Sequence, residues 1–264
     1  MMLRFATESV WVYWALLVMC GLCAGSLLNV VVFRLPLMIQ RNDPHLFNLG
    51  FPRSYCPHCQ LTLTPGDNIP LLSWLWLRGR CRECRETISW RYPAIESLSL
   101  LITLLVASLL PAGPLLLATL LLSWLLLALA IIDSMHFLLP DSLTLSLLWA
   151  GLLCQLAGVL PFVSLEQGIA GAALGYGLFW LLAWGYQIVR GEEGLGRGDA
   201  KLLAAGGAWL GWQTLPPLLL LASSLGITVF MLARLVVKRS LSARLPFGPA
   251  LAAAIWILFL WQNT

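Results

Sequence analysis

Long runs of apolar residues, separated by short polar connections, constrain this chain more than any other feature of its sequence. Almost no charged residue lies inside these runs. A helix needs about 20 mostly apolar residues to cross a hydrocarbon core of about 30 Å. The eight runs lie approximately at residues 10–33, 93–110, 115–132, 143–160, 168–189, 200–211, 218–236 and 247–261. The sequence therefore predicts an all-α polytopic membrane protein with about eight transmembrane helices.

The composition excludes the soluble alternatives. Hydrophobic residue types make up 59% of the 264 residues, charged residues only 11%, and the mean hydropathy is +0.85. A soluble domain carries about 25% charged residues, so an ordinary cytosolic enzyme, a disordered tail and a secreted disulfide scaffold are all excluded. The first run is too long for the apolar part of a signal peptide, about 7–15 residues, and is expected to be a retained span. The sixth run is short and glycine-rich, so we expect a partial or tilted span inside the bundle.

The basic residues indicate how the chain is oriented, because Lys and Arg near the ends of spans stay on the cytoplasmic side. Fifteen of the sixteen fall in alternate connections, eight of them in residues 34–92, and only Arg4 disagrees. This sorting predicts that both termini lie outside. It also divides the chain into a first transmembrane helix (1–33), a cytoplasmic segment (34–92) and a membrane core of about seven helices (93–264). Anionic inner-leaflet lipid is the expected partner of the net charge of +4, and no nucleic acid is needed to explain it.

Four cysteines in the cytoplasmic segment form two Cys-x-x-Cys pairs, Cys56 with Cys59 and Cys81 with Cys84, with 21 residues between the pairs. This pattern is typical of a zinc ribbon, in which four thiolates close a tetrahedral site. Disulfides are the alternative, but structural disulfides are rare in the reducing cytosol. Four ligands leave no open position on the metal, so the predicted zinc is structural. His58 lies within the first pair and is expected to be exposed.

The remaining three cysteines are not expected to bind metal. Cys20 and Cys23 also have the Cys-x-x-Cys spacing, but they lie inside a predicted span, and Cys154 stands alone in another. Free cysteine behaves as a small apolar residue. We therefore expect all three to be packing residues.

Two carboxylates at span ends are candidates for catalysis. Asp133 ends the third run, and Asp199 begins the sixth within a Gly196-x-Gly198-Asp199 motif. Acidic residues at a membrane are costly and commonly functional. Two of them held together share a proton, so that one acts as a base on water while the other donates a hydrogen bond to a carbonyl. Glycines beside Asp199 would let the backbone bend and a substrate strand approach.

Simpler interpretations of the same residues stay open at this point. Asp199 and Asp141 could each be the N-cap of a helix, and Asp133 could be the polar end of one. Asp141 is also a rival to Asp133 as the partner of Asp199, because the hydrophobic periodicity does not separate them.

Several sequence blocks, taken together, resemble the type IV prepilin peptidase family. They cover nearly the whole chain in matching order, with Leu27 at a position where the family often has Phe. The blocks are residues 21–36, the paired cysteines, Arg91-Tyr92-Pro93 with Glu96, the segment from Asp133 to Pro140-Asp141, and Gly-x-Gly-Asp199 with Lys201. The resemblance implies that Asp133 and Asp199 are the catalytic pair. It leaves Asp141, Gly196, Gly198 and Lys201 in supporting roles.

The resemblance also implies a function and its cofactors. Family members remove the short basic leader from type IV prepilins and type II secretion pseudopilins at the bacterial inner membrane. Many then methylate the new N-terminus with S-adenosylmethionine. Leader cleavage agrees with carboxylates at the inner boundary of the bilayer. Methyl transfer rests on the resemblance alone, because the sequence has no strand followed by a glycine-rich dinucleotide turn, and the residues that would bind S-adenosylmethionine are not identified.

Two other classes of function remain as alternatives. A transporter or channel could use Asp133 and Asp199 as an ion site, although such sites usually lie near the bilayer midplane and between repeats, and no inverted repeat is detected. An assembly factor could use its zinc knuckles to dock a partner.

Overall fold

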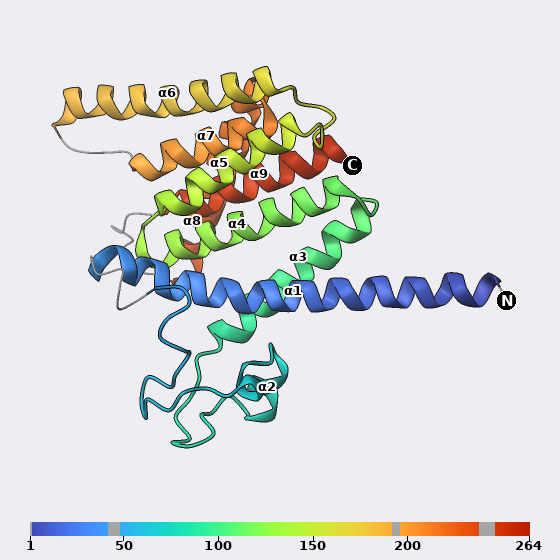
Figure 1. The fold of residues 1–264 in the computed structure, drawn as a ribbon. Coiled ribbons are helices and arrows are strands. Elements are labelled where there is room, and N and C mark those ends of the chain that lie inside the picture. Colours follow the sequence, from blue (N-terminus) through green and yellow to red (C-terminus); the bar gives the residue numbers. More distant parts are fainter. Residues whose placement is uncertain (1, 42–47, 192–195, 238–245) are drawn as a thin grey trace. The chain divides into compact units, whose positions relative to one another are not determined.

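The computed structural model describes residues 2–41, 48–191, 196–237 and 246–264 (Figure 1). Across these ranges the regular structure is helical, and the only β-pairings are two isolated antiparallel bridges. Within these ranges, five helices are long and apolar enough to cross a membrane. The predicted all-α membrane fold is therefore confirmed. The chain divides into two compact units, Met1–Ala112 and Gly113–Thr264. The predicted boundaries at residues 33 and 92 are the points where the chain leaves and re-enters the membrane, and they stay a prediction.

Two helices, α1 (Met2–Arg41) and α3 (Arg91–Leu109), pack together in the first unit. Gly21 and Gly25 allow the close approach, since a Cβ on Gly25 would lie 2.7 Å from the Glu96 Cα. The Ser99 hydroxyl donates to the Gly21 carbonyl at 2.9 Å. Small residues and interhelical hydrogen bonds are the usual means of helix association in a membrane.

Helix α1 is longer than the predicted span, and one expectation for its side chains is wrong. The helix continues beyond residue 33 to Arg41, with Pro36 inside it. Arg34 can lie within the helix because its guanidinium is buried and donates to the carbonyls of Asn48 and Pro52, at 3.0 and 2.6 Å. Cys20 and Cys23 are exposed on α1 rather than packed, because the helix buries its glycine face against α3.

Residues 48–90, between α1 and α3, form a small lobe. The lobe contains the 3₁₀ turn η1 (Pro65–Asn68) and the short helix α2 (Leu72–Trp76). Glu96 of α3 attaches this lobe to the helices. Its Oε2 accepts the Leu71 backbone N–H at 2.8 Å, and its Oε1 accepts from the Asn29 amide of α1 at 3.4 Å. One buried carboxylate thus connects both helices of the unit to the residue that precedes α2.

The second unit is a helical bundle around a short central helix. Its elements are α4 (Pro114–His136), α5 (Asp141–Leu156), α6 (Leu165–Arg190), α7 (Arg197–Leu210), η2 (Trp212–Thr214), α8 (Leu215–Val237) and α9 (Gly248–Asn263). The 14-residue α7 packs against α5, α6, α8 and α9 (Figure 1), and all its residues from Leu202 to Leu210 are buried. This helix is the short sixth run, and its place inside the bundle is as expected.

Glycines set the distance between α6 and α7. Gly171 and Gly207 face each other so closely that a Cβ on either one would overlap the backbone of the other. One turn further along, a Cβ on Gly175 would lie 2.9 Å from the Leu203 carbonyl oxygen. This contact brings α7 close to α6. The beginning of α7 lies beside the loop that joins α4 to α5, because a Cβ on Gly198 would meet Leu139.

Candidate active site and metal centre

Asp133 lies in the last turn of α4 and is buried, with 5% of its surface exposed. Its Oδ2 accepts the backbone N–H of Gly248, the first residue of α9, at 3.0 Å. The helix ends at His136, followed by Phe137 in the left-handed conformation. Asp133 therefore does not form the solvated end of a helix: its carboxylate points into the bundle and is held there by a backbone donor.

Asp199 lies in the first turn of α7, where it is half-buried. The Asp133 carboxylate is close enough to interact electrostatically with Asp199. The structure thus brings together two carboxylates from α4 and α7 that are far apart in sequence. Such a pair can hold one proton between two acids, which is the arrangement that activates water in aspartic proteases.

The two glycines of the Gly-x-Gly-Asp motif leave room for neighbouring side chains. Gly196 is the N-cap of α7 and has a φ of −66°, which any residue can adopt. A Cβ there would lie 3.0 Å from the Asp199 Oδ2, and a Cβ on Gly198 would lie 2.8 Å from the Leu139 Cβ. A side chain at residue 196 or 198 would therefore crowd Asp199 or Leu139, and Gly196 does not have an unusual backbone conformation.

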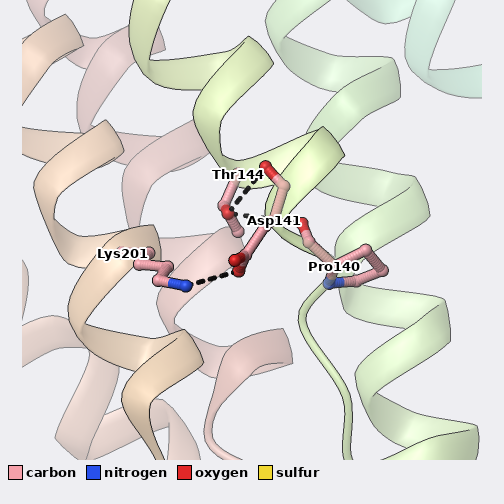
Figure 2. Close-up of polar contacts among 4 residues, drawn as sticks. All are labelled: Pro140, Asp141, Thr144 and Lys201. Carbon is pink, nitrogen blue, oxygen red and sulfur yellow. Dashed lines mark hydrogen bonds and ion pairs between the residues drawn. The ribbon is translucent and has the colours of Figure 1, made fainter. Parts of the chain in front are cut away.

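Asp141 and Lys201 form a second polar contact between α5 and α7. Figure 2 shows the Lys201 Nζ pointing at the Asp141 carboxylate. Nζ lies 2.5 Å from Oδ1. The Thr144 hydroxyl lies at the same helix start, 3.3 Å from the Pro140 carbonyl oxygen. Asp141 is exposed and paired with a cation, whereas Asp133 is buried and lies near another carboxylate.

The N-cap interpretations of the two aspartates do not fit the helix starts. The N-cap of α7 is Gly196, so Asp199 is the third residue of the helix, and the N-cap of α5 is Pro140, so Asp141 is its first residue. Neither helix has a side-chain capping hydrogen bond. The positions of Asp141 and Asp199 therefore need another explanation.

The four predicted cysteines come together in the lobe of the first unit. The sulfur atoms of Cys56, Cys59, Cys81 and Cys84 all lie within 4.8 Å of one another. The Cys56–Cys84 and Cys59–Cys81 sulfur distances are 3.8 and 4.0 Å. Zinc–sulfur bonds of about 2.3 Å in a tetrahedron require sulfur atoms roughly 3.8 Å apart. The cluster therefore has the dimensions of a four-thiolate metal site, and His58 is exposed, as expected.

The two cysteine pairs lie in loops with the same local structure. In each loop the N–H of the first cysteine donates to a carbonyl five residues later: Leu61 for Cys56, at 3.0 Å, and Glu86 for Cys81, at 2.8 Å. The residue after each second cysteine has positive φ, 57° at Gln60 and 60° at Arg85. Backbone N–H groups of Cys59 and His58 lower the pKa of the Cys56 thiol to about 6, and a thiolate is the form that binds metal.

Sequence reasoning missed one residue that contacts the candidate active site, Gly248. A usable signal existed, because Pro249 is favoured in the first turn of a helix and marks the start of α9. Nothing in the local sequence shows that Asp133, far away in the chain, is the acceptor for this helix.

Comparisons with known proteins agree with this arrangement. Residues 19–110 match the bacterial peptidase A24 N-terminal domain, and residues 120–231 match the type IV leader peptidase family. A prepilin leader peptidase/N-methyltransferase of Aeromonas hydrophila is 48% identical, covering 100% of this chain and 96% of that protein. The chain belongs to the type IV leader peptidase family. Like-named proteins of Dickeya chrysanthemi (47% identical, 96% of this chain, 94% of that protein) and Stutzerimonas stutzeri (44%, 92% and 89%) are also similar.

No solved structure matches the chain. The Asp133–Asp199 pair lies within the part that matches the type IV leader peptidase family, and the four cysteines lie within the part that matches the N-terminal domain. Both candidate sites therefore lie in parts of the chain that match a family model.

Proposed function

We propose that this chain is a membrane-embedded aspartic endopeptidase that cleaves the basic leader from type IV prepilins or type II secretion pseudopilins. The proposal rests on one observation: the carboxylates of Asp133 and Asp199 lie near each other in the helical bundle. Both residues belong to the part of the chain that matches the type IV leader peptidase family. The relatives' names give the substrate class, since they are prepilin leader peptidases.

In the proposed reaction the two carboxylates share one proton. The ionised one takes a proton from water, and the water oxygen bonds to the carbonyl carbon of the scissile peptide. The protonated one donates a hydrogen bond to the carbonyl oxygen, where negative charge develops. The bond to nitrogen then breaks, and the leaving amine takes the proton that the first carboxylate had removed from water, which returns that carboxylate to its ionised form. Asp141 stays outside this exchange because Lys201 is its partner.

The proposed site of cleavage is the cytoplasmic face of the bacterial inner membrane. The sorting of basic residues supports this side. Three of these residues, Lys238, Arg239 and Arg244, lie outside the described part of the chain. A substrate with one apolar span and a basic leader would keep its leader on the same side, so its scissile bond would lie at the membrane boundary.

We propose that the four-cysteine cluster binds one structural zinc. The sulfur distances fit a tetrahedral site, and a metal with four protein thiolates has no position left for substrate. Cys56, Cys59, Cys81 and Cys84 would hold the metal, which would keep the two loops of the lobe together.

We also propose that the chain methylates the new N-terminus, with S-adenosylmethionine as the methyl donor. The support is the second activity in the relatives' names. The described residues contain no strand followed by a glycine-rich turn, so a Rossmann-type site for the donor does not fit them, and the residues that would bind it are not assigned.

Coexpression with a prepilin-like substrate tests the proposal. We expect a mobility shift with the wild-type chain and none with Asp133→Asn or Asp199→Asn, while Asp141→Asn serves as the matched control. Adding S-adenosylmethionine with a labelled methyl group should label the mature product only in the active variants, since methylation needs the new N-terminus. Cleavage by both Asp133→Asn and Asp199→Asn would refute the aspartic mechanism.

A further inference from the structure

Helix α9 begins without a side-chain cap of its own. Its N-cap is Phe247, which has no polar side-chain atom, and Pro249 in the first turn has no N–H. The first N–H groups of a helix lack partners within the helix and are usually satisfied from outside. Here the outside acceptor is Asp133 of α4, whose Oδ2 lies 3.0 Å from the Gly248 nitrogen. A candidate catalytic carboxylate thus caps a neighbouring helix.

The contact leaves no room for a side chain at residue 248. A Cβ on Gly248 would lie 2.5 Å from Oδ2 and 2.9 Å from Cγ of Asp133. Both distances are shorter than the closest approach of non-bonded atoms, so a side chain at residue 248 would displace the Asp133 carboxylate. Gly248 does not have positive φ, so the requirement for glycine comes from the carboxylate and not from the backbone conformation.

The residue before Gly248 is anchored on the bundle, which fixes the direction of the N–H. The Phe247 ring packs against the core of the unit, with its centroid 6.3 Å from the ring of the buried Phe179 of α6. Beyond Gly248, α9 packs along α4, α7 and α8. The donor therefore belongs to a well-packed part of the bundle.

We propose that Gly248 is a positioning residue of the active site. Its N–H holds Oδ2 of Asp133, its missing side chain admits the carboxylate, and Oδ1 is left to act on water or on the scissile carbonyl. This inference rests on the proposed peptidase function, because positioning matters only if Asp133 reacts. Holding a reacting group in a fixed orientation increases the reaction rate greatly, and a misplacement of about 1 Å lowers that rate about 100-fold.

The kinetic test compares two glycine-to-alanine variants of the full chain on a prepilin-like substrate. Gly248→Ala is expected to lower kcat about 100-fold with KM little changed, since Asp133 acts in the transition state rather than in substrate binding. Gly226→Ala in α8 is the control, because its Cβ would meet only Ala250 at 3.7 Å and Phe247 at 4.0 Å, ordinary contact distances. Its kcat should stay within about twofold of the wild type. A Gly248→Ala variant as active as this control would overturn the proposal.

A second measurement covers the case in which Gly248→Ala fails to fold. Asp133→Asn keeps an oxygen that can accept the Gly248 N–H, whereas Asp133→Ala removes it, and both are expected to be inactive. Hydrogen exchange of residues 247–252 should therefore be faster in Asp133→Ala than in Asp133→Asn or the wild type. Equal exchange in all three would refute the contact. If the wild type fails to cleave prepilin, the proposed function fails, while the exchange result still decides the role of Gly248 in holding Asp133.

Discussion

Lys201 and Asp141 form an ion pair, with the Lys201 Nζ 2.5 Å from the Asp141 Oδ1 (Figure 2). Lys201 lies in α7, two residues after Asp199. The Asp141 side chain is 62% exposed, so water screens most of the attraction. The pair thus connects α5 to the helix that carries Asp199 without strong electrostatic consequences of its own.

We expect Asp141→Asn to keep substantial cleavage activity. Removing an exposed ion pair costs about 0–1 kcal/mol of stability, and the Asp133–Asp199 pair is left in place. Asp199→Asn has the same small change in volume and should abolish cleavage. The measurement is the rate of leader removal from a prepilin-like substrate in membranes. An inactive Asp141→Asn together with an active Asp133→Asn would mean that the catalytic pair is assigned wrongly.

Replacing Cys56, Cys59, Cys81 or Cys84 by Ser should release about one zinc per chain, because the loss of one thiolate opens a closed site. Residues 54–88 should then become more sensitive to proteases. Cys154→Ala, in α5, is the control and should retain the metal. The check is metal analysis of purified, reduced protein. If the wild-type protein contains no zinc, the assignment of the metal fails.

Leader cleavage should survive brief treatment with EDTA. A metal with four thiolate ligands takes no part in the reaction, so its slow removal would loosen the lobe only later. Cleavage should be lost at high pH, because the dyad needs its shared proton. The measurement is the initial rate with and without chelator and across a pH series. A rapid loss restored by added zinc would indicate a metalloprotease instead.

The contact between Gly171 and Gly207 predicts a specific defect in packing. Gly207→Ala should destabilise the bundle by about 1–3 kcal/mol, the usual cost of overpacking, because a Cβ would overlap the Gly171 backbone. Gly177→Ala in α6 is the matched control, since no atom of the described residues would lie within 4 Å of its Cβ. Thermal unfolding in detergent compares the two. Equal melting temperatures would show that α6 and α7 do not approach so closely.

The sequence was sufficient to predict the features that depend on local pattern. Apolar runs identify the helices, including the short α7, because the length of a span is a property of one segment. The Cys-x-x-Cys pairs likewise identify the cluster, since each loop needs only its own few residues to place two sulfur atoms.

Features that depend on distant pairs could not be predicted in the same way. The cap that Asp133 provides to Gly248 joins residues 115 positions apart, and the attachment of Leu71 to Glu96 joins two parts of the first unit. The apolar run at residues 10–33 does not show how far α1 extends, because Arg34 interrupts the apolar pattern. Arg34 instead finds carbonyl partners at residues 48, 49 and 52, which only the folded chain brings to it.

The side of the membrane on which the carboxylates lie can be tested by labelling. Ser134 follows Asp133 at the end of α4, and Glu166 lies in the first turn of α6. Figure 1 shows that these two helix termini lie at opposite ends of the second unit. Both residues are exposed. If basic residues mark the cytoplasmic side, Ser134→Cys should be protected from an impermeant thiol reagent added to intact cells, and Glu166→Cys should react.

The labelling needs a background in which Cys20, Cys23 and Cys154 are alanine, and permeabilised cells serve as the control in which both new cysteines react. The opposite pattern, with Ser134→Cys labelled from outside, would invert the topology. The cysteine lobe would then lie in an oxidising compartment, where disulfides replace thiolates as the expected state. That single result would remove the argument for zinc and the proposed approach of a basic leader to Asp133 and Asp199.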